Sequence, residues 1–167
     1  MKRYVMLLAL LLLVGCQAGS ALHDPPQEQS APALKLGLRL TAEQSGGDWR
    51  VLLTAPNASD LYQIAGTLRY DPARYDVLGV EAGGGLGGFE DCYFLSGEPV
   101  PGSIAFAYTK RRHGAGAGGD VTLLAVRVSP RGAFRVADFE LDSAPGALVA
   151  RDSAKRNFDI AVAGEVR

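Results

Sequence analysis

The sequence predicts an all-β domain, an antiparallel β-sandwich of about nine short strands, downstream of an N-terminal export signal. Apolar and polar residues alternate with a period of two over several short stretches, which is typical of half-buried strands. The 21 glycines and 9 prolines gather between these stretches, where turns are expected. Beyond the N-terminal apolar run, no stretch shows a convincing helical period.

The N-terminal segment has the layout of a secretory signal. Lys2 and Arg3 give a basic start, and a leucine-rich apolar run follows at 5–14. The run is too short to cross a bilayer as a helix, which takes about 20 residues. It ends in Leu13-Val14-Gly15-Cys16, which resembles the lipobox of bacterial lipoproteins. The alternative is an ordinary signal peptide followed by a cysteine that is there by chance.

The lipobox resemblance implies that residues 1–15 are removed and that Cys16 carries a diacylglycerol as the new N-terminus. The chain is then expected to be exported and lipid-anchored to a bacterial membrane. Gln17 stands where an aspartate often retains lipoproteins at the inner membrane, so the outer membrane or cell surface is favoured. Residues 16–33 are rich in Pro, Gln, Ala and Ser, which predicts a disordered tether before the domain at 34–167.

The first three predicted strands follow from alternation and turn signals. Leucines at every second position predict a strand over 34–41. A Gly-Gly-Asp turn at 46–48 leads into a second strand at 49–53, which we expect to end at Pro56-Asn57. A third strand is predicted at 61–70.

The remaining six strands are predicted by the same signals, at 77–81, 89–95, 103–109, 121–128, 134–141 and 158–166. Residues 121–128 are apolar at nearly every position, which indicates a strand buried on both faces. Glycine-rich segments at 83–88 and 110–119 are expected to be flexible loops.

The charge of the chain excludes some classes of partner. Removal of residues 1–15 takes away Lys2 and Arg3 of the 17 Lys and Arg and none of the 18 Asp and Glu, which leaves a net charge of −3. Nucleic-acid binding demands a basic face, and none is indicated. The same charge balance argues against a polybasic membrane patch, so the lipid would do the anchoring.

The sequence shows no catalytic or metal-binding arrangement, so we expect no enzyme activity, no cofactor and no metal. Neither His23 nor His113 lies beside a serine or cysteine in a recognisable triad, and His113 is expected to be solvated. Cys92, alone once Cys16 is lipidated, is interpreted as a buried small apolar residue. Glu90-Asp91 are interpreted as strand-edge charges, with residues that flank an ion as the alternative. Lys110-Arg111-Arg112 is interpreted as a solvated loop, with contact to an acidic partner or lipid headgroups as the alternative.

The aromatic residues are expected mainly in the core. Trp49 shares parity with Val51 and Leu53, and Tyr62, Tyr93 and Tyr108 also alternate with apolar neighbours. A platform of exposed rings for stacking sugars is therefore the less favoured interpretation.

Four segments together resemble cohesin domains. They are Gly66-Thr67-Leu68-Arg69-Tyr70-Asp71-Pro72, Tyr75-Asp76-Val77-Leu78-Gly79-Val80-Glu81, Pro101-Gly102-Ser103-Ile104-Ala105-Phe106-Ala107, and the apolar strand from Gly119 to Val128. Their order and spacing match that family over about residues 34–166. The resemblance implies a nine-stranded jelly-roll sandwich, related in fold to carbohydrate-binding modules. In the Tyr-Asp-Pro motif we expect Tyr70 to pack inward, Asp71 to cap the turn and Pro72 to end the strand.

The resemblance also implies a function. Its best-known members bind dockerin modules of plant-wall-degrading enzymes through one flat sheet face, without catalysis. Carried onto this sequence, that face comprises Gln63, Ala65, Thr67, Arg69, Ala105, Ala107 and Thr109. Dockerin-binding cohesins usually have an acidic or amide group where Ala65 stands and an acid near Tyr108, and this sequence has neither acid.

The sequence thus predicts a lipid-anchored envelope module that recognises a protein partner, dockerin-like or other. Two alternatives remain open at this point. One is a carbohydrate-binding module, and the other is a structural subunit of an envelope or secretion complex.

Overall fold

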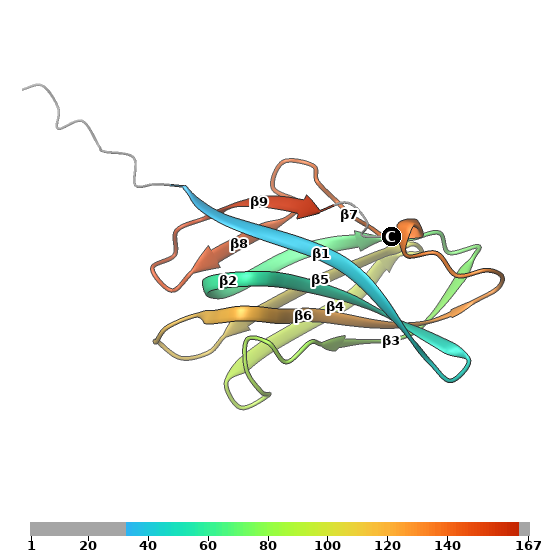
Figure 1. Cartoon of the computed structure of the whole chain (residues 1–167), viewed down its shortest axis with the longest axis horizontal. Helices are drawn as coiled ribbons and strands as arrows, with labels where there is room; N and C mark the ends of the chain where they lie inside the picture. Colours follow the sequence, from blue (N-terminus) through green and yellow to red (C-terminus); the bar gives the residue numbers. More distant parts are fainter. Residues whose placement is uncertain (1–32, 164–167) are drawn as a thin grey trace, which may run out of the picture. The chain divides into compact units, whose positions relative to one another are not determined.

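The computed structural model describes residues 33–163, which form nine strands and one turn of 3₁₀ helix, η1 (Figure 1). The elements in chain order are β1 Leu34–Ser45, β2 Asp48–Arg69, β3 Tyr75–Ala82, β4 Cys92–Val100, β5 Ser103–Lys110, β6 Ala117–Pro130, η1 Val136–Asp138, β7 Glu140–Leu141, β8 Val149–Asp152 and β9 Phe158–Ala163. No helix within this range is long and apolar enough to span a membrane.

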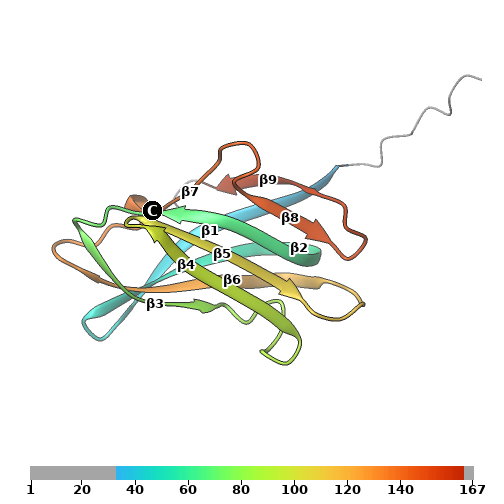
Figure 2. The same ribbon diagram turned by 180° about the vertical axis from the view of Figure 1, so that it is seen from behind.

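Strand β2 belongs to both layers of the sandwich. Its first half pairs with β1 and β6, and β1 and β6 pair in turn with β9 and β3. Its second half pairs with β5 on one side and with β7 and β8 on the other, while β4 lies outside β5. The two layers therefore continue into each other through β2 (Figures 1 and 2).

The space between the layers is filled by apolar side chains from both. The largest fully buried side chains include Leu53 from the first half of β2, Leu61 and Ile64 from its second half, and Leu123 from β6. One end of this core is aromatic, because Trp49 stacks on Phe134 with ring centroids 4.1 Å apart. Burial of this apolar surface is the main stabilising contribution to such a fold.

The all-β jelly-roll prediction is confirmed, but the direction of one strand pair and the end of one strand differ from the prediction. β1 and β9 run parallel in the register Leu34 opposite Phe158, so the sheet is mixed instead of purely antiparallel. The predicted strand end at Pro56-Asn57 is wrong, because β2 continues through it. The strand bulges there, where Asn57 and Asp60 have positive φ, and a bulge accommodates a proline that cannot donate to the ladder.

Two other predictions change in the structure, and one strand is new. The predicted strand 134–141 is wrong over most of its length, because η1 occupies its middle and only β7 pairs with β2. β8 was not predicted. The loop at 83–88 is held against β6, since Gly83 N donates to Leu123 O at 3.1 Å and a Cβ on Gly83 would lie 2.4 Å from the backbone of Thr122.

The Tyr-Asp-Pro corner is built as expected. β2 ends at Arg69, and the Asp71 carboxylate accepts the N–H of Ala73 at 2.9 Å. The ring of Tyr70 is partly buried against Phe139, and its hydroxyl donates to Glu98. Burial, together with that carboxylate, raises the pKa of Tyr70 to about 12, so the phenol stays protonated as a donor.

Gly102 joins this corner to the Pro-Gly motif. Its carbonyl accepts the N–H of Tyr70 at 3.0 Å, and its own N–H donates to Glu98 at 2.9 Å. Gly102 has φ +85°, and a Cβ there would lie 2.8 Å from the carbonyl oxygen of Tyr70. The two motifs are thus parts of one corner that positions the start of β5.

Gly102→Ala is expected to lower the free energy of unfolding by about 1–2 kcal/mol, because it forces a side chain into the left-handed region and against Tyr70. Urea denaturation followed by circular dichroism measures the change. Gly97→Ala is the control, since a Cβ at Gly97 meets no atom within 4 Å and no positive φ is found there. Equal stability of the two variants would contradict this account of the corner.

Candidate functional site

The second half of β2 and its neighbours form a sheet whose outer face carries all seven of the predicted face residues. Gln63 lies opposite Thr109, Ala65 opposite Ala107, and Thr67 opposite Ala105. Directly opposed residues point to the same side of a sheet, and the intervening Ile64, Leu68 and Tyr108 are buried. The structure therefore brings the predicted residues together, with Arg69 at the end of β2.

The face extends beyond the predicted residues, onto β8 and β4, and is arranged in rows across the strands (Figure 2). The first row comprises Arg151, Gln63, Thr109 and Tyr93. The second row comprises Val149, Ala65, Ala107 and Leu95. The third row comprises Thr67, Ala105 and Gly97. We call these three rows and Arg69 the outer face.

Strand β4 contributes the most exposed apolar side chains of the outer face. Leu95 is 70% exposed and Tyr93 is 56% exposed. The expectation that Tyr93 lies in the core is wrong, whereas Tyr108 is buried as expected and Trp49 packs against the core. Cys92 and Phe94 on either side of Tyr93 are also apolar, so alternation could not show which set points inward.

A shallow hollow lies beside Leu95. It has a volume of about 250 Å³ and is lined by Leu95, Ser96, Gly97, Ala105, Phe106 and Ala107. The hollow exists because Gly97, Ala105 and Ala107 are small, so that Leu95 stands above its neighbours. Exposed apolar surface next to a hollow is a feature of protein interaction sites.

An arginine stands at each end of the outer face, and the two arginines have different partners. At the third-row end, the guanidinium of Arg69 donates to Asp142 at 2.5 Å. The backbone N–H of Ala144 and then Arg69 lower the pKa of Asp142, so this carboxylate is ionised and already paired. At the first-row end, Arg151 donates to the amide oxygen of Asn157 at 3.1 Å. The three rows themselves contain no carboxylate.

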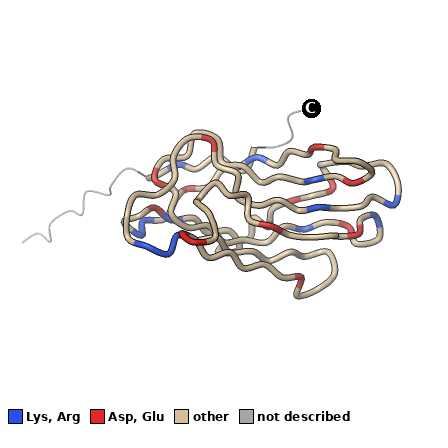
Figure 3. Tube along the Cα trace, turned by 90° about the horizontal axis from the view of Figure 1, so that it is seen from below, with Lys and Arg blue, Asp and Glu red and all other residues tan. Residues whose placement is uncertain are grey.

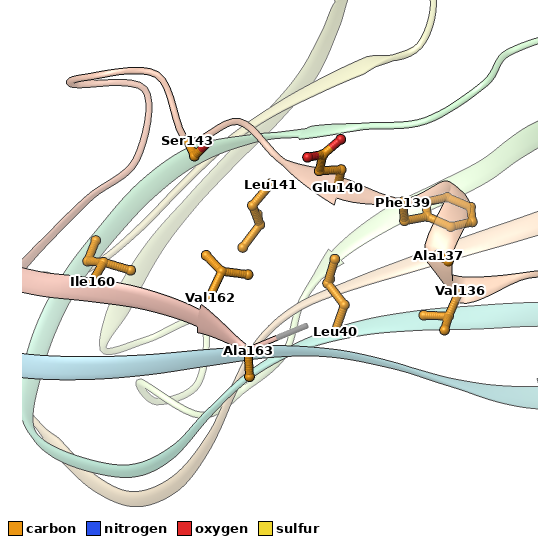
Figure 4. Close-up of a pocket in the computed structure, with 10 residues that line it drawn as sticks. All are labelled: Leu40, Val136, Ala137, Phe139, Glu140, Leu141, Ser143, Ile160, Val162 and Ala163. Atoms are coloured by element: carbon orange, nitrogen blue, oxygen red, sulfur yellow. The ribbon is translucent and has the colours of Figure 1, made fainter. Parts of the chain in front are cut away.

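A separate apolar cavity of about 580 Å³ lies between η1, β7 and β9 (Figure 4). Leu40, Leu141 and Val162 point into it, and its polar lining residues are Glu140 and Ser143. These two groups do not make a nucleophile and base pair of the kind used in acyl or glycosyl transfer. Within residues 33–163, no three His, Cys, Asp or Glu residues are grouped to hold a metal ion.

Cys92, the first residue of β4, is buried, as predicted. It is 3% exposed, and burial raises the pKa of its thiol. His113 lies exposed in the loop after β5, also as predicted. Cys16 and the rest of the predicted signal and tether lie outside the described residues.

The Cys92 thiol is expected to be inert in the folded domain, because it is both buried and protonated at neutral pH. Reaction of the residue 33–167 domain with Ellman's reagent at pH 8 should be at least 100-fold slower in buffer than in 6 M guanidinium chloride. Fast labelling in buffer would show that Cys92 reaches solvent.

The comparisons with known proteins agree on the fold. No protein-family model matches the chain, and no curated protein sequence matches it. Solved structures do match, and among them are several cohesin modules.

The sixth cohesin of scaffoldin B from Acetivibrio cellulolyticus, solved in complex with a dockerin, is 12% identical, with a TM-score of 0.61 over 78% of this chain and 94% of that one. The non-cellulosomal cohesin of the archaeon Archaeoglobus fulgidus is 16% identical, with a TM-score of 0.59 over 77% and 86%. The cohesin module of a Clostridium perfringens family 33 glycoside hydrolase is 13% identical, with a TM-score of 0.57 over 77% and 91%. The chain therefore carries a cohesin-like domain.

Proposed function

We propose that this domain is a protein-binding module and that the outer face is its binding surface. The observation that carries the proposal is the second row, where Ala65 and Ala107 form a flat apolar strip beside the exposed Leu95. Apolar surface of this kind at the centre of a sheet is suited to docking against a partner. Similar cohesin modules solved in complex with dockerins support this proposal.

The test is to block the strip without changing its charge. Ala107 is half-buried between Ala65 and Leu95 in the middle of the outer face, so Ala107→Tyr places a bulky side chain there. Ala161→Tyr, on an exposed position of β9 in the other layer, is the matched control. We expect a protein captured from the exported fraction by the wild-type domain to be captured by Ala161→Tyr and lost with Ala107→Tyr. Equal recovery by both variants would refute the proposed surface.

We also propose that Cys16 anchors the protein by lipid. The basis is the sequence alone, in which Leu13-Val14-Gly15-Cys16 lies at the end of the predicted export signal and resembles a lipobox. Metabolic labelling with an alkyne fatty acid should modify the wild-type protein and leave Cys16→Ser unlabelled. Fatty-acid labelling of Cys16→Ser would show that the anchor lies elsewhere.

Carbohydrate binding is a second candidate, favoured by one observation. Tyr93 and Phe89 are 56% and 85% exposed, and exposed rings can stack on sugars. One face of Tyr93 is already covered, because the guanidinium of Arg111 lies 4.0 Å from the ring centroid. A glycan array probed with the wild-type domain and Tyr93→Ala distinguishes this candidate, since sugar stacking requires a signal that Tyr93→Ala abolishes.

A further inference from the structure

A guanidinium is fixed beside two aromatic rings at the first-row end of the outer face. Arg111 lies 4.0 Å from the ring centroid of Tyr93 and 5.3 Å from that of Phe89. Its Nε donates to the carbonyl of Cys92 at 3.0 Å, and its backbone N–H donates to the carbonyl of Asp91 at 2.8 Å. We call Phe89, Tyr93 and Arg111 the aromatic clamp.

The aromatic clamp holds the charge of Arg111 without neutralising it. No carboxylate among residues 33–163 lies within ion-pair distance of this guanidinium, and its two terminal nitrogens make no hydrogen bond in that range. The side chain is exposed. Stacking on two rings and the bond to Cys92 fix its position, so little conformational entropy remains to be lost on binding.

The first row of the outer face carries a second basic residue, and none of the three rows contains an acid. Tyr93 is the last residue of the first row, and Arg151 stands at the other end of that row. Lys110 and Arg112 flank Arg111 in the chain, and Figure 3 shows one basic stretch there, but these two residues line a separate hollow together with Asp91. Three acids lie near the clamp. Glu90 and Asp91 precede β4, and Glu81 lines the same pocket of about 400 Å³ as the three clamp residues without forming an ion pair with Arg111.

On these observations we propose that the outer face recognises a protein segment that presents an aspartate or glutamate to Arg111 and apolar side chains to the second row. This inference rests on the proposed function and names the chemistry of the partner. A carboxylate matches the fork of two guanidinium nitrogens, and such pairs are shorter and stronger than neutral hydrogen bonds. Leu95 and Ala107 lie one row away, so one extended or helical segment can reach both features.

The experiment uses a phage-displayed library of random 12-residue peptides selected on the full chain. We expect the selected peptides to be enriched in Asp or Glu next to apolar residues. The binding of one resynthesised peptide is then measured by fluorescence anisotropy. Arg111→Gln should weaken it about tenfold, and Tyr93→Leu, which keeps an apolar residue but removes the ring, should weaken it about threefold. Arg127→Gln, at an exposed arginine of β6 in the other layer, is the matched control and should bind as wild type.

The outcomes separate this inference from the proposed function. Selected peptides without acidic enrichment, or equal binding by Arg111→Gln and Arg127→Gln, would overturn the inference. If Ala107→Tyr still abolishes binding in that case, the proposed function stands. Binding of polygalacturonate or of anionic phospholipid vesicles that depends on Arg111, with no peptide selected, would also overturn it, because the carboxylate or phosphate source would then not be a protein. Thermal unfolding of each variant confirms that it is folded.

Discussion

Replacing Leu68 with alanine is expected to lower the free energy of unfolding by about 3 kcal/mol, the largest effect among our predictions. Leu68 is fully buried in the second half of β2. It lies opposite Ile104 of β5 on one side and opposite Leu141 of β7 on the other, and both are buried. Truncation therefore leaves a cavity between three strands, which the rigid sheet cannot close.

Chemical denaturation with urea, extrapolated to water, measures this loss. Leu78→Ala is the matched control, because Leu78 on β3 is 44% exposed and its truncation should cost less than about 1 kcal/mol. A loss at Leu68 no larger than that at Leu78 would mean that β7 does not close the core at this position.

Replacing Arg156 with alanine is expected to cost about 2 to 3 kcal/mol. Two nitrogens of its guanidinium bond Asp152 at 2.7 Å, and the Asp152 side chain is 1% exposed. Loss of the guanidinium leaves a buried carboxylate with less compensation, which is strongly destabilising in proteins. The cost is moderated because Arg156 is itself half exposed, and because its backbone N–H continues to donate to Asp152 at 2.7 Å.

Urea denaturation at pH 7 tests this second prediction. The exposed pair of Arg50 and Glu43 supplies the control, since Arg50→Ala should cost less than about 1 kcal/mol. Adding Asp152→Asn to Arg156→Ala should restore part of the lost stability, because it removes the buried charge. No recovery in the double variant would show that the guanidinium acts through packing instead of charge.

The sequence predicted strands best where alternation was long and clear, as in β1 and β5, or where the apolar run was continuous, as in β6. It failed where one strand has two environments. Pro56 and Asn57 read as a strand end, but β2 bulges there and passes from one layer to the other. β8 is only four residues long and includes Arg151 and Asp152, so its period is too short to recognise. At 134–141 the apolar residues do reach the core, but Phe134 and Phe139 do so from the segments on either side of η1 and only Leu141 does so from a strand, β7.

The candidate site was predicted in part. The resemblance to cohesins placed the β2 and β5 residues correctly on one face, because their alternation fixes their side once the strands pair. The contributions of Tyr93, Leu95 and Arg151 were missed. Neighbouring apolar residues hide the parity of β4, and Arg151 lies on the strand that was not recognised. In the aromatic clamp Arg111 contacts Phe89, which is distant in the sequence, and no local sequence pattern predicts such a contact.

The parallel pairing of β1 and β9 has a mechanical consequence. β1 is paired along its whole length, its first half with β9 in the register Leu34 to Arg39 and its second half with β2 in the register Arg39 to Ser45. Tension applied at Leu34 along the strand axis would load these two ladders in shear, so that many hydrogen bonds must break together. A strand peeled from its end would lose them one at a time. A domain attached through the start of β1 is thus built to resist pulling in that direction.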